Sequence, residues 1–133
     1  MRLLLDTHVF VWTQEDPRRL GPQTRRSLLD PNNDLCVSPF STLELARLVY
    51  SGKLILKAGL DVWLTNAINL LQARSLSFDH RVAEEAYALP GAFHKDPADR
   101  VLVSTARVEC ATLITADDLI LKYPHVRARD ARK

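Results

Sequence analysis

Glycine and cysteine are scarce in this chain, with four glycines and two cysteines among 133 residues. No glycine-rich segment is present that could wrap a phosphate group. Cys36 and Cys110 lack the spacing of metal ligands and lie among apolar residues, which predicts two buried free thiols rather than a disulfide. No serine occupies a nucleophile elbow, and no ligand spacing connects the four histidines, His8, His80, His94 and His125. These absences argue against several common types of active site.

Long apolar runs are also missing. No segment approaches the roughly 20 apolar residues that a bilayer span requires. Asp6 and His8 interrupt the apolar run at the start of the chain, so residues 1–15 do not have the pattern of a signal peptide. We therefore expect a cytoplasmic protein.

Neither sign of charge dominates, because 18 basic and 16 acidic residues leave a formal net charge of +2. This balance permits a polyanionic substrate but gives little support for one. The charge is uneven, since residues 123–133 form a basic tail. We interpret the tail as a solvated end of the chain, and phosphate contact is the alternative.

The composition, 47% hydrophobic and 26% charged, is that of a globular protein. The length suits one domain with its own core, so we expect a single domain over residues 1–133. Short apolar runs at residues 3–5, 35–37 and 111–115 predict strands buried on both faces. Amphipathic segments alternate with them. This pattern predicts an α/β fold, a three-layer α/β/α sandwich with a central parallel sheet.

Capping signals predict where the helices begin. Ser38 and Asp96 each combine a capping side chain with a following proline, and Thr7 and Asp79 are expected to cap two further helices. Helices are also predicted over residues 22–29, 60–73 and 117–122, a strand over 75–77, and a sheet-edge pairing at Val126. The helix after Ser38 is expected to bury a broad apolar face, made of Leu43, Leu45, Ala46, Leu48 and Val49.

Four acidic residues stand just beyond predicted strands or near predicted helix starts, namely Asp6, Glu44, Asp99 and Asp117. The carboxyl ends of parallel strands open into the crevice where such folds bind ligands. Carboxylates that share a crevice repel one another, and a bound hard cation relieves the repulsion. Oxygen ligands favour Mg²⁺ or Mn²⁺ over zinc. The four acids therefore predict a divalent-metal site.

Asp6 and Glu44 each have a simpler interpretation. Asp6 can cap the helix that follows it, although Thr7 offers an alternative cap that frees Asp6 for other work. Glu44 can lie on a solvated helix face, but an ionised carboxylate among apolar neighbours needs a partner. Ser41, one turn earlier, can donate a hydrogen bond to Glu44 or to a ligand.

The remaining acids also occupy positions that suit helix caps. Asp96 needs no role beyond capping, and Asp99 can complete an arrangement similar to a capping box. Either Asp117 or Asp118 can cap the short helix, and we assign Asp117 to the crevice because it is nearer the strand end. Thr115, two residues earlier on that strand, can donate a hydrogen bond at the same rim.

Four segments in chain order resemble the motifs of PIN-domain nucleases: residues 2–12, 38–44, 94–106 and 113–120. At this length the chain most resembles the VapC-type toxins of bacterial toxin–antitoxin pairs. The resemblance implies an endoribonuclease that depends on Mg²⁺ or Mn²⁺ and forms a homodimer. It also implies a small antitoxin protein that inserts a segment near the site. The motif positions make Asp6, Glu44, Asp99 and Asp117 the acidic quartet, with Asp96 as a fifth candidate.

The resulting hypothesis is metal-assisted hydrolysis of RNA phosphodiesters. Asp6 and Asp99 are expected to bind one or two cations directly, and Glu44 and Asp117 through water. Arg100 can contact phosphate or form an exposed ion pair. One alternative is a binding module of the same fold whose acids only cap helices. Another is a phosphatase-like hydrolase with Asp6 as nucleophile, which the histidine two residues later disfavours.

Overall fold

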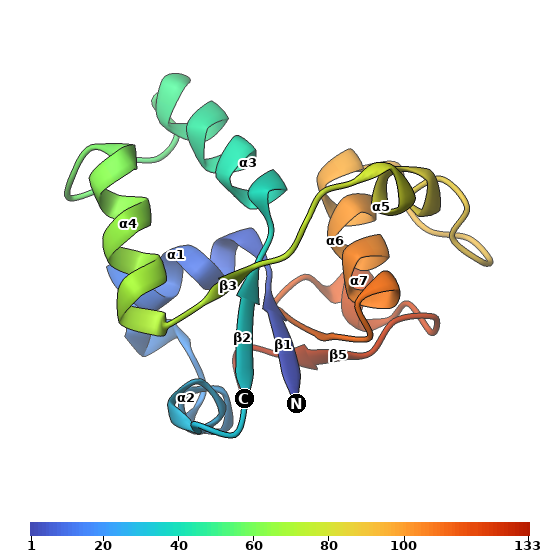
Figure 1. Ribbon diagram of the computed structural model, residues 1–133, viewed down its shortest axis with the longest axis horizontal. Coiled ribbons are helices and arrows are strands. Elements are labelled where there is room, and N and C mark those ends of the chain that lie inside the picture. Colours follow the sequence, from blue (N-terminus) through green and yellow to red (C-terminus); the bar gives the residue numbers. More distant parts are fainter.

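Five parallel strands form the centre of the structure, in the order β3-β2-β1-β4-β5 (Figure 1). The computed structural model describes residues 1–133. The strands are β1 (Arg2–Leu5), β2 (Asp34–Val37), β3 (Arg74–Ser75), β4 (Thr112–Thr115) and β5 (Ala128–Asp130). β1 lies in the middle, where Leu4 is in register with Cys36 of β2 and with Leu113 of β4. The predicted parallel sheet is confirmed.

The central strand is buried on both faces, as its uninterrupted apolar run predicts. Leu3, Leu4 and Leu5 have no exposed surface. Because successive side chains of a strand point to opposite faces, Leu3 and Leu5 belong to one hydrophobic core and Leu4 to a second. The sheet therefore needs helices on both sides.

Helices cover both faces and complete the predicted three-layer arrangement (Figure 1). They are α1 (Thr7–Glu15), the 3-10 helix η1 (Pro17–Arg19), α2 (Pro22–Leu29), α3 (Pro39–Tyr50), α4 (Leu60–Leu71), α5 (His80–Glu85), α6 (Pro97–Val108) and α7 (Asp118–Leu121). Phe10 of α1 and Trp63 of α4 meet edge to face over the first core, with ring centroids 5.2 Å apart. Leu102 of α6 and Ile120 of α7 fill the second. None of the helices has the length and apolar character that a bilayer span requires.

Three of the four predicted caps are confirmed. Ser38 accepts a hydrogen bond from the backbone N–H of Phe40, and Asp79 and Asp96 accept one from the residue three positions later. The prediction for Thr7 is wrong, because Thr7 is already the first helical residue. The N-cap position belongs to Asp6, whose side chain makes no capping hydrogen bond. Both side chains are thus available for other contacts.

The prediction of a broad buried face on α3 is wrong. Leu45 is fully buried, but Leu43 is 60% exposed and Val49 also lies at the surface, because no other element packs over the far part of α3.

The exposure of Cys110 is a second correction. Cys36 is buried as expected, whereas Cys110 is exposed in a turn after α6, where it has a positive φ of 52°. Both thiols are free.

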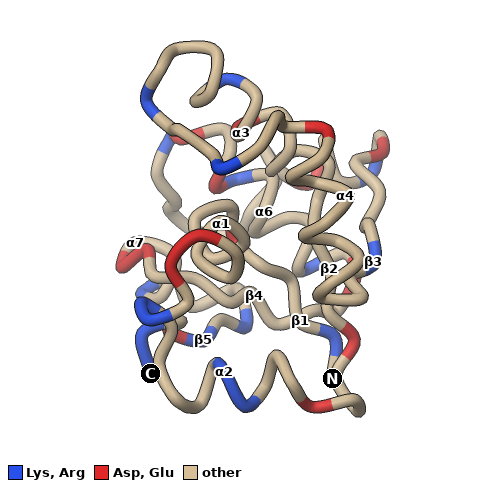
Figure 2. Tube along the Cα trace, turned by 90° about the vertical axis from the view of Figure 1, so that its left-hand side faces the viewer, with Lys and Arg blue, Asp and Glu red and all other residues tan.

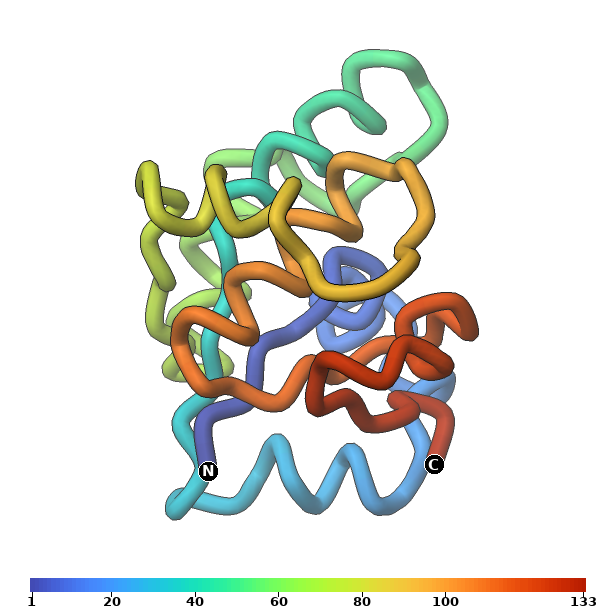
Figure 3. The backbone as a smooth tube through the Cα atoms, turned by 90° about the vertical axis from the view of Figure 1, so that its right-hand side faces the viewer, coloured from blue at the N-terminus to red at the C-terminus, as the bar shows by residue number.

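The backbone of the basic segment at residues 123–133 packs against the rest of the fold, while its arginines and Lys133 remain exposed to solvent as expected. Figure 2 shows its basic residues close to the acidic start of α7, and Figure 3 shows it beside the start of α2. Ala131 is fully buried, and the carbonyl of Lys133 accepts a hydrogen bond from the backbone N–H of Thr24 at 3.0 Å. Gly21 lies against this segment so closely that a side chain there would clash with Lys133.

Two strands differ from their predicted positions. The edge strand is β5 rather than a pairing at Val126, and β3 covers Arg74–Ser75 rather than residues 75–77.

Candidate active site

The four acids of the sequence hypothesis line one cavity of about 560 Å³. Asp6 and Asp117 follow β1 and β4, which are neighbours in the sheet, so their positions share one edge. Glu44 reaches this edge from α3, and Asp99 from the first turn of α6. Four segments that are distant in the chain therefore place their carboxylates around one space.

Asp6 is the most deeply buried of these acids, with 7% of its surface exposed. Its Oδ2 accepts a hydrogen bond of 2.6 Å from the hydroxyl of Thr115, at the end of β4. The same hydroxyl oxygen accepts the backbone N–H of Asp117 at 3.0 Å. Burial raises the pKa of Asp6, and the Thr115 hydrogen bond opposes this rise only in part. Thr115 thus connects two of the acids.

Glu44 is held by a short chain of hydroxyls. Thr7 Oγ1 lies 2.6 Å from Glu44 Oε1 and 2.9 Å from Ser41 Oγ. Because a hydroxyl has one proton, Thr7 donates to the carboxylate, and its oxygen accepts the proton of Ser41. Burial raises the pKa of Glu44, and the negative charges of Asp6 and Asp96 add to this rise. Ser41 supports Glu44 through Thr7 rather than by direct contact.

The pKa of Asp99 is raised by burial and by several neighbouring carboxylates. Burial, followed by the negative charges of Asp117, Asp6 and Asp96, raises the pKa of Asp99 to about 8. The cluster therefore cannot carry its full negative charge at neutral pH unless a positive charge joins it. Asp96 caps α6 and also lines the cavity, so its two interpretations are compatible.

Asp117 likewise combines two roles. Its Oδ1 accepts the backbone N–H of Leu119 at 2.8 Å and so caps α7, while the residue lines the cavity. Asp118 is exposed and forms an ion pair of 2.9 Å with Arg132. The assignment of Asp118 to the solvent side is confirmed.

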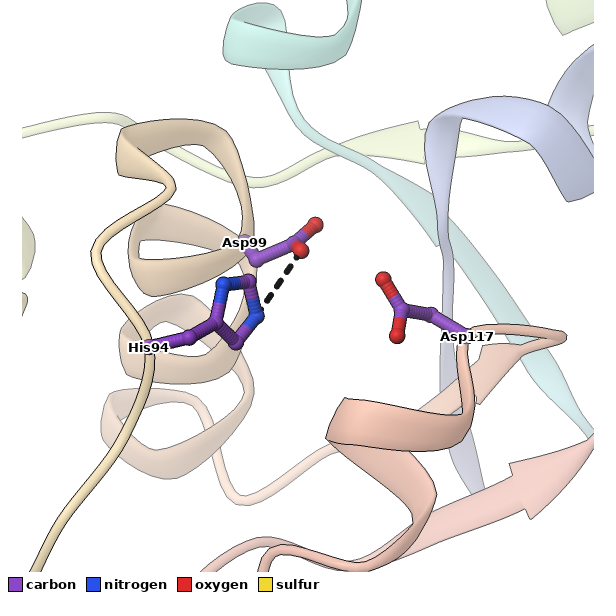
Figure 4. A group of neighbouring side chains, drawn as sticks. All are labelled: His94, Asp99 and Asp117. Carbon is purple, nitrogen blue, oxygen red and sulfur yellow. Dashed lines mark ion pairs between the residues drawn. The ribbon is translucent and has the colours of Figure 1, made fainter.

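His94 joins this cluster, and the sequence hypothesis did not include it among the site residues. Figure 4 shows its imidazole facing the gap between Asp99 and Asp117. One ligand atom from each of these three residues lies within 4.8 Å of the others. No regular spacing relates His94 to the acids, because it lies in an irregular loop before α6. The only sequence signal was its position at the start of the segment that contains Asp96 and Asp99.

Arg100 does not line the cavity and forms no ion pair, so the structure shows neither of the two roles that the sequence left open for it. Its Nε donates to the carbonyl of Ala86, and its Nη1 donates to the carbonyls of Phe93 and His94 at 3.1 and 3.0 Å. The guanidinium also lies over the ring of Tyr87. Arg100 therefore fastens the loop that carries His94.

Three other arginines line the cavity: Arg19, Arg47 and Arg132. Arg132 is neutralised by ion pairs with Asp118 and Asp130. Arg19 and Arg47 form no ion pair, and Arg19 lies over the ring of Trp12 at 4.6 Å from its centroid. Two unpaired cationic side chains thus border the acidic cluster.

A family model described as the PIN domain matches residues 3–126. The chain belongs to the PIN-domain family. It is 31% identical over 125 residues to Ribonuclease VapC22 of Mycobacterium tuberculosis, with 94% of each chain covered. Among solved structures it resembles VapBC2 from Rickettsia felis bound to a promoter DNA fragment, with a TM-score of 0.68, 21% identity, and 97% and 98% of the two chains covered. A toxin–antitoxin complex from Klebsiella pneumoniae matches with a TM-score of 0.63, 17% identity and 97% of each chain covered.

The donor set of this PIN domain fits a divalent cation. Burial raises the pKa values of Asp6, Glu44 and Asp99, so their ionised forms are disfavoured in the bare cavity. A cation bound among them reverses this cost, and carboxylate oxygens are the ligands that Mg²⁺ and Mn²⁺ prefer. The Nε2 atom of His94 is buried, makes no hydrogen bond and lies 3.0 Å from Asp99 Oδ2, with which it pairs when the ring is protonated, so it is one further potential ligand atom at the same place.

Proposed function

We propose that this protein is a divalent-metal-dependent endoribonuclease that hydrolyses RNA phosphodiester bonds. We further propose that it is the toxin of a toxin–antitoxin pair and is inhibited by a cognate antitoxin. The observation that carries the proposal is the convergence of Asp6, Glu44, Asp99 and Asp117 on one cavity. The 31% identity to a ribonuclease over almost the whole chain supports the reaction class.

In the proposed site, Asp6 and Asp99 bind the cation directly, Glu44 and Asp117 bind it through water, and Asp96 is an additional ligand. A bound Mg²⁺ or Mn²⁺ supplies a coordinated water of lowered pKa and stabilises negative charge on the phosphate. The hydroxyl of Thr115 orients the Asp6 carboxylate by donating a hydrogen bond to its Oδ2. Direct and water-mediated metal binding both require ionised carboxylates. This requirement explains why so many acids occupy a partly buried space.

Glu44 is the residue that we assign to proton transfer. Thr7 occupies its Oε1, so Oε2 remains to accept a proton from the attacking water. The raised pKa of Glu44, caused mainly by burial, makes it a stronger base than an exposed glutamate. His8 lines the same cavity but makes no hydrogen bond to Glu44.

Arg19 and Arg47 are the residues that we assign to the RNA backbone. Both border the cavity without an acidic partner, so their charge is free to attract phosphate. They also offset the repulsion between the acidic cluster and a polyanion. This assignment replaces Arg100, whose Nε and Nη1 atoms donate to backbone carbonyls.

A protein partner is supported by apolar surface on α3 and the loop after it. Tyr50 is 94% exposed and Ile55 is 89% exposed, and Leu43 lies on the same helix as Tyr50. Figure 1 shows α3 and this loop projecting from the rest of the molecule. Exposed apolar groups of this size are typical of interaction surfaces. We propose that the antitoxin and a second copy of the chain, as a homodimer, are the partners.

The alternative of a binding module whose acids only cap helices is less well supported. Capping accounts for Asp96 and Asp117, which both make the required hydrogen bonds. It does not account for Asp6, whose side chain makes no capping bond, or for Glu44, which lies in the middle of α3. A buried acid without a structural task indicates a functional one.

The proposal is tested with purified protein, single-stranded and structured RNA, and Mg²⁺ or Mn²⁺. We expect cleavage that stops in excess EDTA and in Asp6→Asn, whose fold is checked by circular dichroism. Asp61→Asn is the matched control, because Asp61 is exposed on α4 and does not line the cavity, so this variant should retain full activity. Undiminished cleavage in EDTA or in Asp6→Asn would overturn the proposal.

A further inference from the structure

The Nε2 atom of His94 has no hydrogen-bond partner although it is shielded from solvent. Asp99 Oδ2 lies 3.0 Å away and forms an ion pair with the ring when His94 is protonated, although the contact lacks hydrogen-bond geometry. Figure 4 shows this ion pair as a dashed line, with Asp117 across a gap from the two residues. A buried polar atom without a partner is rare in folded proteins and often marks the place of an ion.

The three donors around this space have the spacing of cation ligands. Neighbouring ligands of an octahedral ion with bonds of about 2.1 Å lie about 3 Å apart, as His94 Nε2 and Asp99 Oδ2 do. The ligand atom of Asp117 completes a group whose members all lie within 4.8 Å of one another. This spacing suits an Asp117 carboxylate that reaches a cation between the other two through a bound water.

The loop that carries His94 is held firmly despite having no helix or strand. The carbonyls of Phe93 and His94 both accept hydrogen bonds from Arg100. The Phe93 ring packs against the His94 ring with centroids 4.4 Å apart, and against Tyr123 at 4.7 Å. The orientation of the imidazole is therefore fixed by its surroundings, as is typical of metal ligands.

We propose that His94 binds the divalent cation of the site through Nε2, beside the direct ligand Asp99, while Asp117 binds it through water. A nitrogen ligand changes the selectivity of the site. Mg²⁺ strongly prefers oxygen ligands, whereas imidazole binds later divalent metals well, so this site favours Mn²⁺ over Mg²⁺. A neutral ring bound through Nε2 carries its proton on Nδ1, so the long contact of 3.4 Å from the backbone N–H of Asp96 to Nδ1 is given up. The inference rests on the proposed function only for the existence of a divalent site.

Pulsed EPR of Mn²⁺ bound to the intact wild-type chain tests the ligand directly. We expect a ¹⁴N coupling that disappears in His94→Asn and persists in His8→Asn, a matched variant because His8 is the histidine that lines the cavity of the acids. Absence of the coupling in the wild type overturns the inference without any variant. Its persistence in folded His94→Asn, or its loss in His8→Asn, overturns it as well.

Calorimetric titration of the two metals tests the selectivity. We expect His94→Asn to weaken Mn²⁺ binding about tenfold or more and Mg²⁺ binding much less, while His80→Asn, exposed on α5, changes neither. Equal losses for both metals overturn the selectivity. If the wild type cleaves RNA with Mn²⁺ but shows no ¹⁴N coupling, the proposed function stands and the His94 inference fails. If the wild type binds neither metal, both fail.

Discussion

The hydroxyl of Thr115 donates a hydrogen bond of 2.6 Å to the carboxylate of Asp6, and both residues are buried. The bond joins the carboxyl ends of β4 and β1, the two strands whose following residues contribute acids to the cavity. It is also the strongest contact that lowers the pKa of Asp6 against the effect of burial. Thr115 therefore acts on the site through Asp6.

Replacement of Thr115 tests this dependence. Thr115→Val keeps the shape of the side chain but leaves the buried carboxylate of Asp6 without its donor, which costs about 1–3 kcal/mol of folding free energy. We expect a lower urea midpoint at neutral pH and reduced RNA cleavage. Thr115→Ser, which retains the hydroxyl, is the control and should remain near the wild type. A valine variant as stable and active as the wild type would show that the bond does not matter.

The raised pKa of Asp99 predicts how the metal-free protein responds to pH. Asp99 has an ordinary pKa of 3.8 and a folded value of about 8, raised by burial first and then by Asp117 and Asp6. Between these values the folded state holds more protons than the unfolded state. The contribution of Asp99 to folding stability is therefore fully present below pH 4 and is lost as the pH rises towards 8. We expect the melting temperature in EDTA to decrease from pH 5 to pH 8.

Asp99→Asn provides the matched comparison, because asparagine resembles the protonated aspartate and cannot ionise. In EDTA at pH 8 the variant should melt above the wild type, and its melting temperature should depend less on pH. Mn²⁺ should stabilise the wild type more as pH rises, since the metal competes with protons for the carboxylates, and should stabilise the variant less. A wild type that gains stability in EDTA between pH 5 and pH 8 would contradict this account.

The unpaired arginines predict the dependence of RNA binding on salt. Arg47→Gln removes one cationic contact, so RNA affinity should fall and the slope of log affinity against log salt should decrease by about 0.7. The reduction should be similar for RNAs of different sequence, because phosphate contacts do not read bases. Arg26→Gln is the control, since Arg26 is exposed on α2 and does not line the cavity. An unchanged salt slope in Arg47→Gln would exclude a phosphate contact.

Arg100 should behave differently from Arg47. Arg100→Gln removes the donors to the carbonyls of Ala86, Phe93 and His94, so we expect a loss of about 2 kcal/mol in urea unfolding. Mn²⁺ affinity should also fall, because the His94 loop loses its support. The salt slope of RNA binding should not change. A reduced slope with normal stability would instead restore Arg100 as a phosphate ligand.

Local patterns were sufficient for the elements that carry the acids. The apolar runs of β1 and β4 end immediately before Asp6 and near Asp117, and strand direction then places both at one edge of the sheet. The Ser38 and Asp96 caps placed the starts of α3 and α6, and with them Glu44 and Asp99. These predictions succeeded because each depends on residues close together in the chain.

The sequence by itself determined the alternation of strands and helices and the order of the acidic motifs, because backbone capping and side-chain periodicity are local properties. Only the tertiary structure decided that Leu43 is exposed, that residues 128–130 form an edge strand, and that Arg100 holds a loop instead of facing the cavity. The position of His94 beside Asp99 and Asp117 was decided in the same way. Each of these outcomes depends on which distant segment packs against the residue, and a local pattern contains no information about that partner.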